Sequence, residues 1–415
     1  MDRYVNLPPS YARLPAGGCI AVASMFVGFA AGCGPEDVGP TPIVQDSAGV
    51  ELVRHGPLAD YGRPVIPAEY ILTIGDMEGP PEMLFAEVAG VELLDDGTIA
   101  VLDRDAAEIR QFSPDGSFLR RISRRGSGPG EISGDFTVGL VGIGAGRLLV
   151  PDAINQTVTI FDREGGLLES QPWDILQSYM PEWRAASDTT LAVHLWSATA
   201  PWHVLAHRSV TGALLDTLAV FAVRPSFNPA DQRFPVWADM LVWSTREPDQ
   251  AVAGWMSEPW VILFRRGTPV RRISWERDEE LLTEEQHDIL LGIIARNMDP
   301  GGIPPDLRAQ VRLPERLPAM ADIETSAELV LVQRVRSVER LDQRITYVNR
   351  GPSGFGGPLW DVFSFEGDYR GVLDLGAPAD VFDIRGDTIL GVREDSLGVQ
   401  HPFLARIPAE LREGR

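Results

Sequence analysis

Cysteine is nearly absent from this chain. Only two of the 415 residues are cysteine, Cys19 and Cys33, and both lie at the N-terminal end. The rest of the chain can form no internal disulfide, and a cysteine nucleophile after Cys33 is excluded. The sequence also lacks the H-E-x-x-H and C-x-x-C patterns and a complete P-loop, so the metal and phosphate chemistry that these motifs support is not indicated.

Basic residues are also few compared with acidic ones. The chain carries 37 basic and 59 acidic residues, which gives a formal net charge of -22. Proteins bind nucleic acids mainly by neutralising phosphates with lysine and arginine. We therefore expect no nucleic-acid partner.

The first 33 residues have the pattern of an export signal. An apolar run over residues 17–33 follows Arg3 and Arg13, and it is shorter than the ~20 residues of a membrane span. The small residues just before Cys33 resemble a bacterial lipobox, in which the cysteine is lipidated and becomes the first mature residue. We therefore expect residues 1–32 to be a lipoprotein signal peptide and residues 33–48, rich in glycine, proline and acid, to be a flexible tether.

This interpretation predicts an exported lipoprotein of the cell envelope, periplasmic or tethered to the outer membrane. Its contact with the membrane would be through the lipid on Cys33 alone. The alternatives are an uncleaved anchor or ordinary secretion. The body of the protein is exported in each case.

An internal repeat determines the expected fold. The stretch GTIAVLDRDAAEIRQFSPDGSFL from Gly97 aligns without gaps with GRLLVPDAINQTVTIFDREGGLL from Gly146, an offset of 49 residues. Each unit consists of strand-length apolar runs separated by turn sequences such as SPDG and REGG. A repeat of ~40–50 residues with about four strands is typical of a β-propeller blade.

Weaker copies of the unit follow, and they bring the total to six. We therefore expect an all-β chain in which residues 49–411 form a six-bladed β-propeller. The last copy lacks a fourth strand, and residues 70–75 align with the fourth strand of a blade. An N-terminal strand should thus complete the last blade and close the ring, which removes exposed sheet edges.

The glycine-rich stretch RRGSGPGEI at residues 124–132 has a place in this scheme. No helix is expected directly after it, so it is not a phosphate-binding loop. It lies between the fourth strand of one blade and the first strand of the next. Glycine and proline there let the chain cross one face of the propeller with little steric bulk.

The motifs GSGPGEI and LLVPDAINQTVTIFDREG resemble an NHL repeat. The chain from about Gly49 onward is similar to bacterial six-bladed β-propeller lipoproteins related to that family. The resemblance implies a binding platform that in some members is an enzyme, and it does not specify the ligand.

Residues 278–317 interrupt the strand pattern. TEEQHDILLGIIARNM has apolar residues at helical spacing, and Thr283 with Gln286 fits a capping box. DLRAQV predicts a second short helix. This helical insertion is expected either to cover a face as a lid or to pack against the rim of the propeller.

One face of the propeller should collect polar side chains. In a four-stranded meander, the turn between strands two and three opens on the same face as the loops that cross between blades. This places six residues on one predicted ligand-binding face: Asp103, Asp152, Asn155, Arg124, Arg125 and Glu131. The cluster is expected to bind a polar ligand or a calcium ion through oxygen ligands. The alternative is that the Asp and Asn side chains bond their own backbone.

Three histidines, His194, His203 and His207, fall close together in the third blade. His203 and His207 are too far apart along one strand to share a metal ion, but His194 with either one remains possible across neighbouring strands. The alternative is ordinary strand surface. Nine of the ten tryptophans lie between Trp173 and Trp275, where packing between blades is favoured over stacking on a ligand.

Two functions are compatible with these features. The first is an envelope-anchored, monomeric binding module whose ligand is a protein, a peptide or a glycan. The second is a metal-dependent hydrolase or lyase that resembles gluconolactonase-type propellers. Such an enzyme needs metal ligands from several blades, and Asn155 is the one asparagine at a clear blade position. We therefore expect a binding protein rather than an enzyme.

Overall fold

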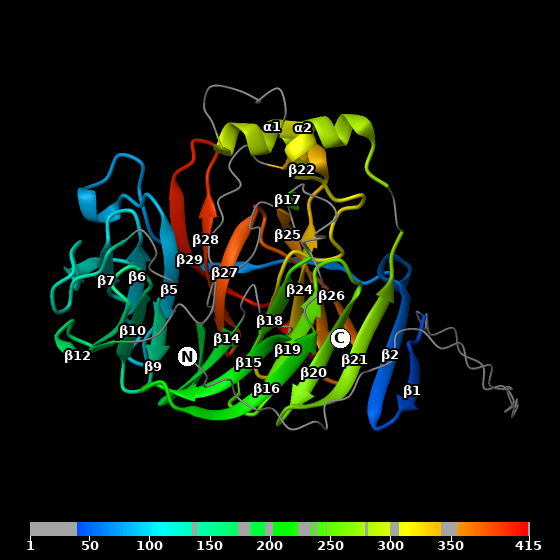
Figure 1. Cartoon of the computed structure of the whole chain (residues 1–415), viewed down its shortest axis with the longest axis horizontal. Coiled ribbons are helices and arrows are strands. Elements are labelled where there is room, and N and C mark those ends of the chain that lie inside the picture. Colours follow the sequence, from blue (N-terminus) through cyan, green and yellow to red (C-terminus); the bar gives the residue numbers. More distant parts are fainter. Residues whose placement is uncertain are drawn as a thin grey trace, which may run out of the picture. The chain divides into compact units, whose positions relative to one another are not determined.

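The chain folds into a six-bladed β-propeller, seen in a computed structural model (Figure 1). The structure describes residues 40–134, 139–172, 183–195, 202–222, 234–235, 239–245, 247–278, 281–298, 307–341 and 355–413. The expected signal peptide and Cys33 lie outside these residues. None of the helices in the described ranges is long and apolar enough to span a membrane.

Each blade is an antiparallel meander of four strands, numbered outward from the central channel. Blade 1 contains β5 (Val88–Leu93), β6 (Ile99–Asp103), β7 (Glu108–Phe112) and β8 (Phe118–Arg121). Blade 2 contains β9 (Val141–Ile143), β10 (Arg147–Asp152), β11 (Thr157–Phe161) and β12 (Leu167–Pro172). Blade 3 contains β13 (Trp183–Ser187), β14 (Thr190–Leu195), β15 (Trp202–Ser209) and β16 (Leu214–Ala222).

The other three blades follow the same plan. Blade 4 contains β18 (Leu241–Ser244), β19 (Gln250–Trp255), β20 (Trp260–Arg265) and β21 (Thr268–Glu276). Blade 5 contains β23 (Ile323–Thr325), β24 (Leu329–Val335), β25 (Gly356–Ser364) and β26 (Tyr369–Asp374). Blade 6 contains β27 (Ala379–Arg385), β28 (Thr388–Glu394), β29 (Gln400–Arg406) and, as its fourth strand, β4 (Glu69–Thr73).

The predicted ring closure is confirmed. β4 pairs antiparallel with β29, with Leu72 opposite Leu404. A buried apolar cluster joins blade 6 to blade 1 through Phe382, Val392 and Ile99 among others. Similar clusters fill the other five gaps between neighbouring blades, and each fully buried aliphatic or aromatic side chain contributes about 1.5–3 kcal/mol.

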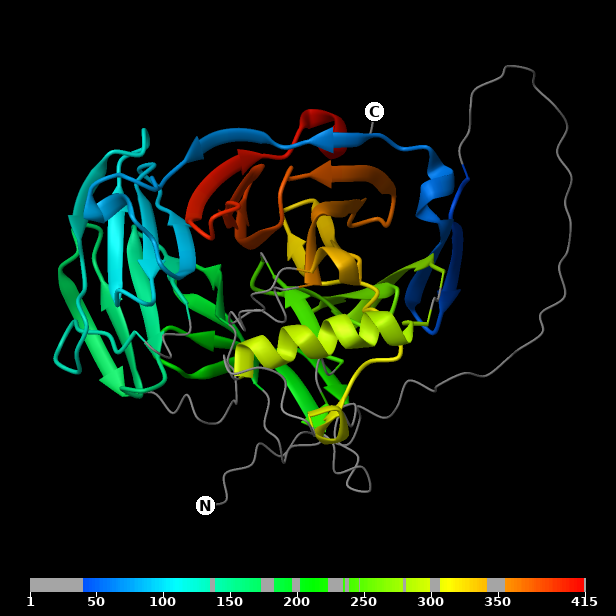
Figure 2. The ribbon, with the colours of Figure 1, turned by 90° about the horizontal axis from the view of Figure 1, so that it is seen from above.

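Strands β1 to β4 form what we call the N-terminal belt. Its first strands are β1 (Ile43–Ser47), β2 (Val50–Pro57) and β3 (Val65–Pro67). β2 adds parallel to β21 of blade 4, and β3 adds parallel to β26 of blade 5. Figure 2 shows the belt passing along the outer edges of these blades.

The belt corrects the expected tether of residues 33–48. Residues Ile43–Ser47 are not a free linker, because all five pair with β2 in a hairpin. The sequence signal was misleading because all five residues of this edge strand are exposed, so β1 has no buried face that would produce an alternating pattern. His55 holds the belt in place: its Nε2–H donates to the Gly367 carbonyl at 2.8 Å, and its Nδ1 accepts from the Tyr61 hydroxyl at 2.9 Å.

The ring has two faces, which differ in the loops that they carry. The crossing face carries the links between blades and the turns between strands two and three. The turn face carries the turns between strands one and two and between strands three and four. Residues 124–132 link β8 to β9 as expected, and so belong to the crossing face.

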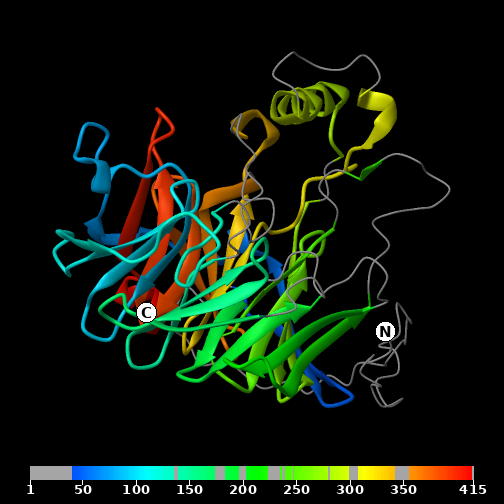
Figure 3. The same ribbon diagram turned by 60° about the vertical axis from the view of Figure 1, so that its left-hand side comes forward.

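The helical insertion lies on the crossing face. It contains α1 (Glu284–Met298), α2 (Leu307–Gln310) and β22 (Val311–Arg312), which pairs with β17 (Phe234–Pro235). The capping box is present, since Gln286 N–H donates to Thr283 Oγ1 at 3.2 Å and Thr283 N–H to Gln286 Oε1 at 3.0 Å. α1 stands above the strand ends in Figure 1 and Figure 3, and its Leu290 and Ile293 pack with Phe355, the residue just before β25.

Shorter elements complete the described chain. They are the 3-10 helices η1 (Leu58–Tyr61), η2 (Pro81–Met83) and η4 (Val338–Arg340), and the C-terminal helix α3 (Ala409–Glu413).

Candidate functional site

The predicted face is brought together, but its two aspartates are used internally. Asp103 is 1% exposed and accepts hydrogen bonds from the backbone N–H groups of Ala86, Glu87 and Ala106 at 3.3 Å each. Arg110 Nη2 donates to the same carboxylate at 3.2 Å. Asp103 thus fastens the loop before blade 1 to the turn between its second and third strands.

Asp152 repeats this arrangement in blade 2. Its carboxylate, also 1% exposed, accepts from Ser133 N–H at 2.6 Å and Ser133 Oγ–H at 2.8 Å. The N–H groups of Ile154 and Asn155 donate to it at 3.1 and 3.0 Å. A carboxylate surrounded by N–H donors has no oxygen turned toward a cation or ligand. Contrary to the expectation from sequence, Asp103 and Asp152 do not face a ligand.

The other four predicted residues brace the crossing loop. Asn155 Nδ2 donates to the Gly126 carbonyl at 2.9 Å. Glu131 accepts from Gly128 N–H at 2.9 Å and from Arg124 Nε at 2.8 Å, and these two bonds lower the pKa of Glu131, the first more than the second. Arg125 bonds two backbone carbonyls, and the Arg124 side chain is 82% exposed. That Arg124 and Arg125 of this face contact a ligand stays a prediction.

The candidate metal pair in blade 3 is a hydrogen-bonded histidine pair. His194 Nε2 and His203 Nδ1 lie 2.9 Å apart, and the rings stack with their centroids 5.1 Å apart. Burial, with a smaller contribution from His203, lowers the pKa of His194 to about 3; burial lowers that of His203 to about 4. Within the described ranges, no group of three or more His, Cys, Asp or Glu side chains is placed to hold a metal ion.

Two ion-pair clusters on the innermost strands were not predicted from the sequence. Arg184 of β13 donates to Glu324 of β23 at 2.6 Å, and Ser244 of β18 donates to the same carboxylate at 3.2 Å. These residues come from blades 3, 5 and 4 and are at most 7% exposed. The cluster of Arg184, Ser244 and Glu324 therefore ties blades 3, 4 and 5 together at the channel.

The second cluster joins blade 6 to blade 1. Arg385 Nη2 donates to Glu92 Oε2 at 2.8 Å and Arg385 Nε to Asp383 Oδ2 at 2.8 Å. The negative charge of Glu92 is the main cause of a raised pKa for Arg385. Arg385 lies at the end of β27, where the channel opens on the turn face.

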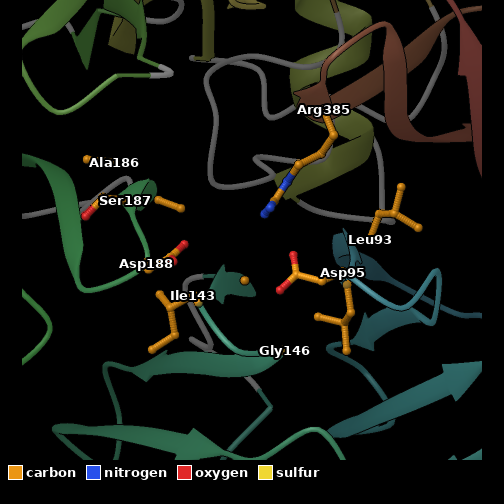
Figure 4. A pocket seen from close by; sticks show the side chains of 12 residues that line it. Leu93, Asp95, Ile143, Gly146, Ala186, Ser187, Asp188 and Arg385 are labelled. Atoms are coloured by element: carbon orange, nitrogen blue, oxygen red, sulfur yellow. The ribbon is translucent and has the colours of Figure 1, made fainter.

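A pocket of about 100 Å³ lies at this opening (Figure 4). Its wall includes Gly142, Gly144 and Gly146, which alternate along and just after β9. A Cβ at Gly142 would lie 2.7 Å from Glu92 Oε2, and one at Gly144 would collide with Asp188. The alternating glycines thus leave room for charged side chains of neighbouring blades. Glycine at every second position from Gly142 to Gly146 is the feature of the sequence that marks this pocket.

Two carboxylates at this pocket have no partner in the part of the chain that the structure describes. Asp95 follows β5 and Asp188 follows β13, and both are exposed. Neither carboxylate forms a hydrogen bond or an ion pair with any described residue, although every other charged group at the opening does. Figure 4 shows the Arg385 side chain reaching toward the space between them. Three of the residues that line the pocket are charged, Asp95, Asp188 and Arg385. Arg385 is already paired with Glu92 and Asp383, so the two aspartates are the carboxylates available to a cationic group.

Comparisons by sequence identify no relative: no protein-family model matches the chain, and neither does any curated protein. Solved structures with a similar fold exist. A protein from Bacteroides fragilis described as exported has a TM-score of 0.48 at 10% identity, and the match covers 86% of this chain and 100% of that one. Virginiamycin B lyase from Staphylococcus aureus gives 0.43 at 9%, covering 81% and 99%. BamB from Moraxella catarrhalis gives 0.37 at 8%, covering 82% and 100%.

Proposed function

We propose that this protein is an envelope-anchored binding module that takes up a basic group of a protein, peptide or amino-bearing glycan at the turn-face opening of its channel. The observation that carries the proposal is the pair of unpartnered carboxylates, Asp95 and Asp188, at a concave site. Ligand pockets carry a small number of polar or charged groups that orient the ligand and provide specificity. The resemblance to NHL-type propeller lipoproteins agrees with a binding role.

The size of the pocket favours part of a larger partner over a small-molecule substrate. Pockets for small molecules usually measure ~300–1,000 Å³, whereas this one measures about 100 Å³. It can take the end of one side chain or one amino group. The net charge of -22 would attract a basic partner over a longer range and accelerate its association.

Anchoring through a lipid on Cys33 belongs to the same proposal. Ile43, where the belt begins, lies ten positions after Cys33, and an extended chain spans at most ~3.6 Å per residue. A lipid on Cys33 would hold the outer edge of blade 4 within roughly 35 Å of a membrane. The metal-dependent hydrolase or lyase stays the alternative prediction.

Binding of a labelled tri-lysine peptide to the purified protein tests the proposal by fluorescence anisotropy, with a tri-glutamate peptide as the ligand control. The double variant Asp95→Asn/Asp188→Asn should bind tri-lysine about fivefold more weakly, because two exposed ion pairs contribute ~0.5 kcal/mol each. Asp60→Asn, which removes an exposed acid of η1 distant in sequence from the pocket, is the matched control. Equal affinities for the double variant and the control would refute the proposal.

A further inference from the structure

A second cavity, of about 370 Å³, lies on the turn face between blades 4 and 5. It shares no lining residue with the channel pocket. Three arginines from separate elements line it: Arg265 at the end of β20, Arg370 on β26 and Arg412 on α3. In a chain with 22 more acids than bases and no lysine, a gathering of three guanidinium groups requires an explanation.

Structural ion pairing does not account for these arginines. The Arg265 guanidinium forms no hydrogen bond or ion pair with any residue that the structure describes. The Arg370 Nε is buried without a hydrogen-bond partner, and its Nη atoms make only long contacts, 3.5 Å to the Glu413 carbonyl and 3.6 Å to Asp368. Arg412 lies 3.5 Å from Asp387. These distances exceed the 2.7–2.9 Å of a good charge-assisted hydrogen bond.

The remaining wall is suited to a polar organic molecule. Phe365 provides an aromatic surface, and the exposed Glu328 and Glu366 place two carboxylates beside the cavity. Neither carboxylate pairs with a described residue, so both can accept hydrogen bonds from hydroxyl groups. An inorganic anion could bind the arginines, but it has no hydroxyl group to donate to Glu328 and Glu366, and its negative charge would be repelled by these two carboxylates.

We infer that this cavity binds a small sugar carrying an oxyanion, either the carboxylate of a sugar acid or the phosphate of a sugar phosphate. Guanidinium groups bind both oxyanions through paired N–H donors. The hydroxyl groups of the sugar donate to Glu328 and Glu366, and its ring lies against Phe365. The volume of about 370 Å³ falls within the range of small-molecule sites.

Isothermal titration calorimetry of the purified full chain tests the inference with glucuronate and glucose 6-phosphate, and with glucose and inorganic phosphate as reference ligands. We expect one of the two anionic sugars to bind, which identifies the source of the oxyanion, and both reference ligands to bind at least tenfold more weakly. Arg265→Gln should weaken that binding at least tenfold, because hydrogen bonds to charged groups are strong. Arg265 is exposed and unpaired, so this variant should fold normally.

Arg412→Gln is a second test from a different element, and Arg121→Gln, at a partly exposed arginine of β8 in blade 1, is the matched control. The control should bind like the unaltered protein. The inference is overturned if neither anionic sugar binds up to about 10 mM, if glucose or phosphate binds as tightly, or if Arg265→Gln and Arg412→Gln both leave the affinity unchanged. These results do not depend on Asp95 or Asp188, so they separate this site from the proposed function.

Discussion

Replacing Asp152 with alanine should destabilise the fold strongly, although this acid lies in a turn. The carboxylate accepts from three backbone N–H groups, those of Ser133, Ile154 and Asn155, at 2.6 to 3.1 Å. Alanine leaves all three donors without their acceptor at a site where the side chain is 1% exposed. A lost bond of this kind costs at least about 1 kcal/mol. The expected loss in the free energy of unfolding is therefore about 3 kcal/mol.

Urea unfolding followed by tryptophan fluorescence measures this loss. Asp152→Asn should cost less, because it retains one acceptor oxygen, although its amide group then faces the Ser133 N–H. Arg124→Ala is the control on the same face: its side chain is 82% exposed, and exposed substitutions usually change stability by no more than ~0.5 kcal/mol. If Asp152→Ala and Arg124→Ala gave the same unfolding free energy, the structural role of Asp152 would be wrong.

Three further predictions concern the histidine pair, the belt and the anchor. Because burial lowers the pKa of His194 and His203 to about 3 and about 4, the unfolded chain takes up protons near pH ~6.5 that the folded chain does not. Stability should fall by about 1.4 kcal/mol per pH unit for each histidine as the pH drops from ~6 to ~4, and glutamine at both positions should remove this slope in urea unfolding. Deleting residues 34–76 should lower the melting temperature and the cooperativity of unfolding, because β29 loses β4, whereas deleting residues 34–41 should change neither. Cys33→Ser should move the protein from the membrane to the soluble fraction and remove the acyl mass; membrane retention with an unchanged mass would contradict the lipobox.

Local sequence patterns were enough to predict the architecture. The 49-residue offset between Gly97 and Gly146, and the turn sequences within each unit, predicted the blades and their strand order. The missing fourth strand of the last unit predicted ring closure, which β4 confirms. The capping box at Thr283 predicted where α1 begins. The strand and turn signals within each unit, and the capping box, depend on residues a few positions apart.

The belt shows where local patterns fail. β2 and β3 add to blades whose strands lie more than 200 positions later, as in the Glu51 to Arg271 pairing. Pairing at a sheet edge uses backbone groups, which are the same for every residue type except proline. No side-chain pattern in residues 43–67 therefore specified which edge these strands would cover.

The candidate sites depended still more on tertiary structure. Alternating glycines and turn acids are visible in the sequence, and so is every arginine of the two proposed sites. Whether an acid is used internally, as Asp152 is, or left without a partner, as Asp95 is, depends on which donors the ring brings to it. Arg184 and Glu324 are 140 positions apart, and Arg385 and Glu92 are 293 apart. The sequence determined the blades because periodicity and turn chemistry are local; only ring closure decided which charges were paired and which remained available for a ligand.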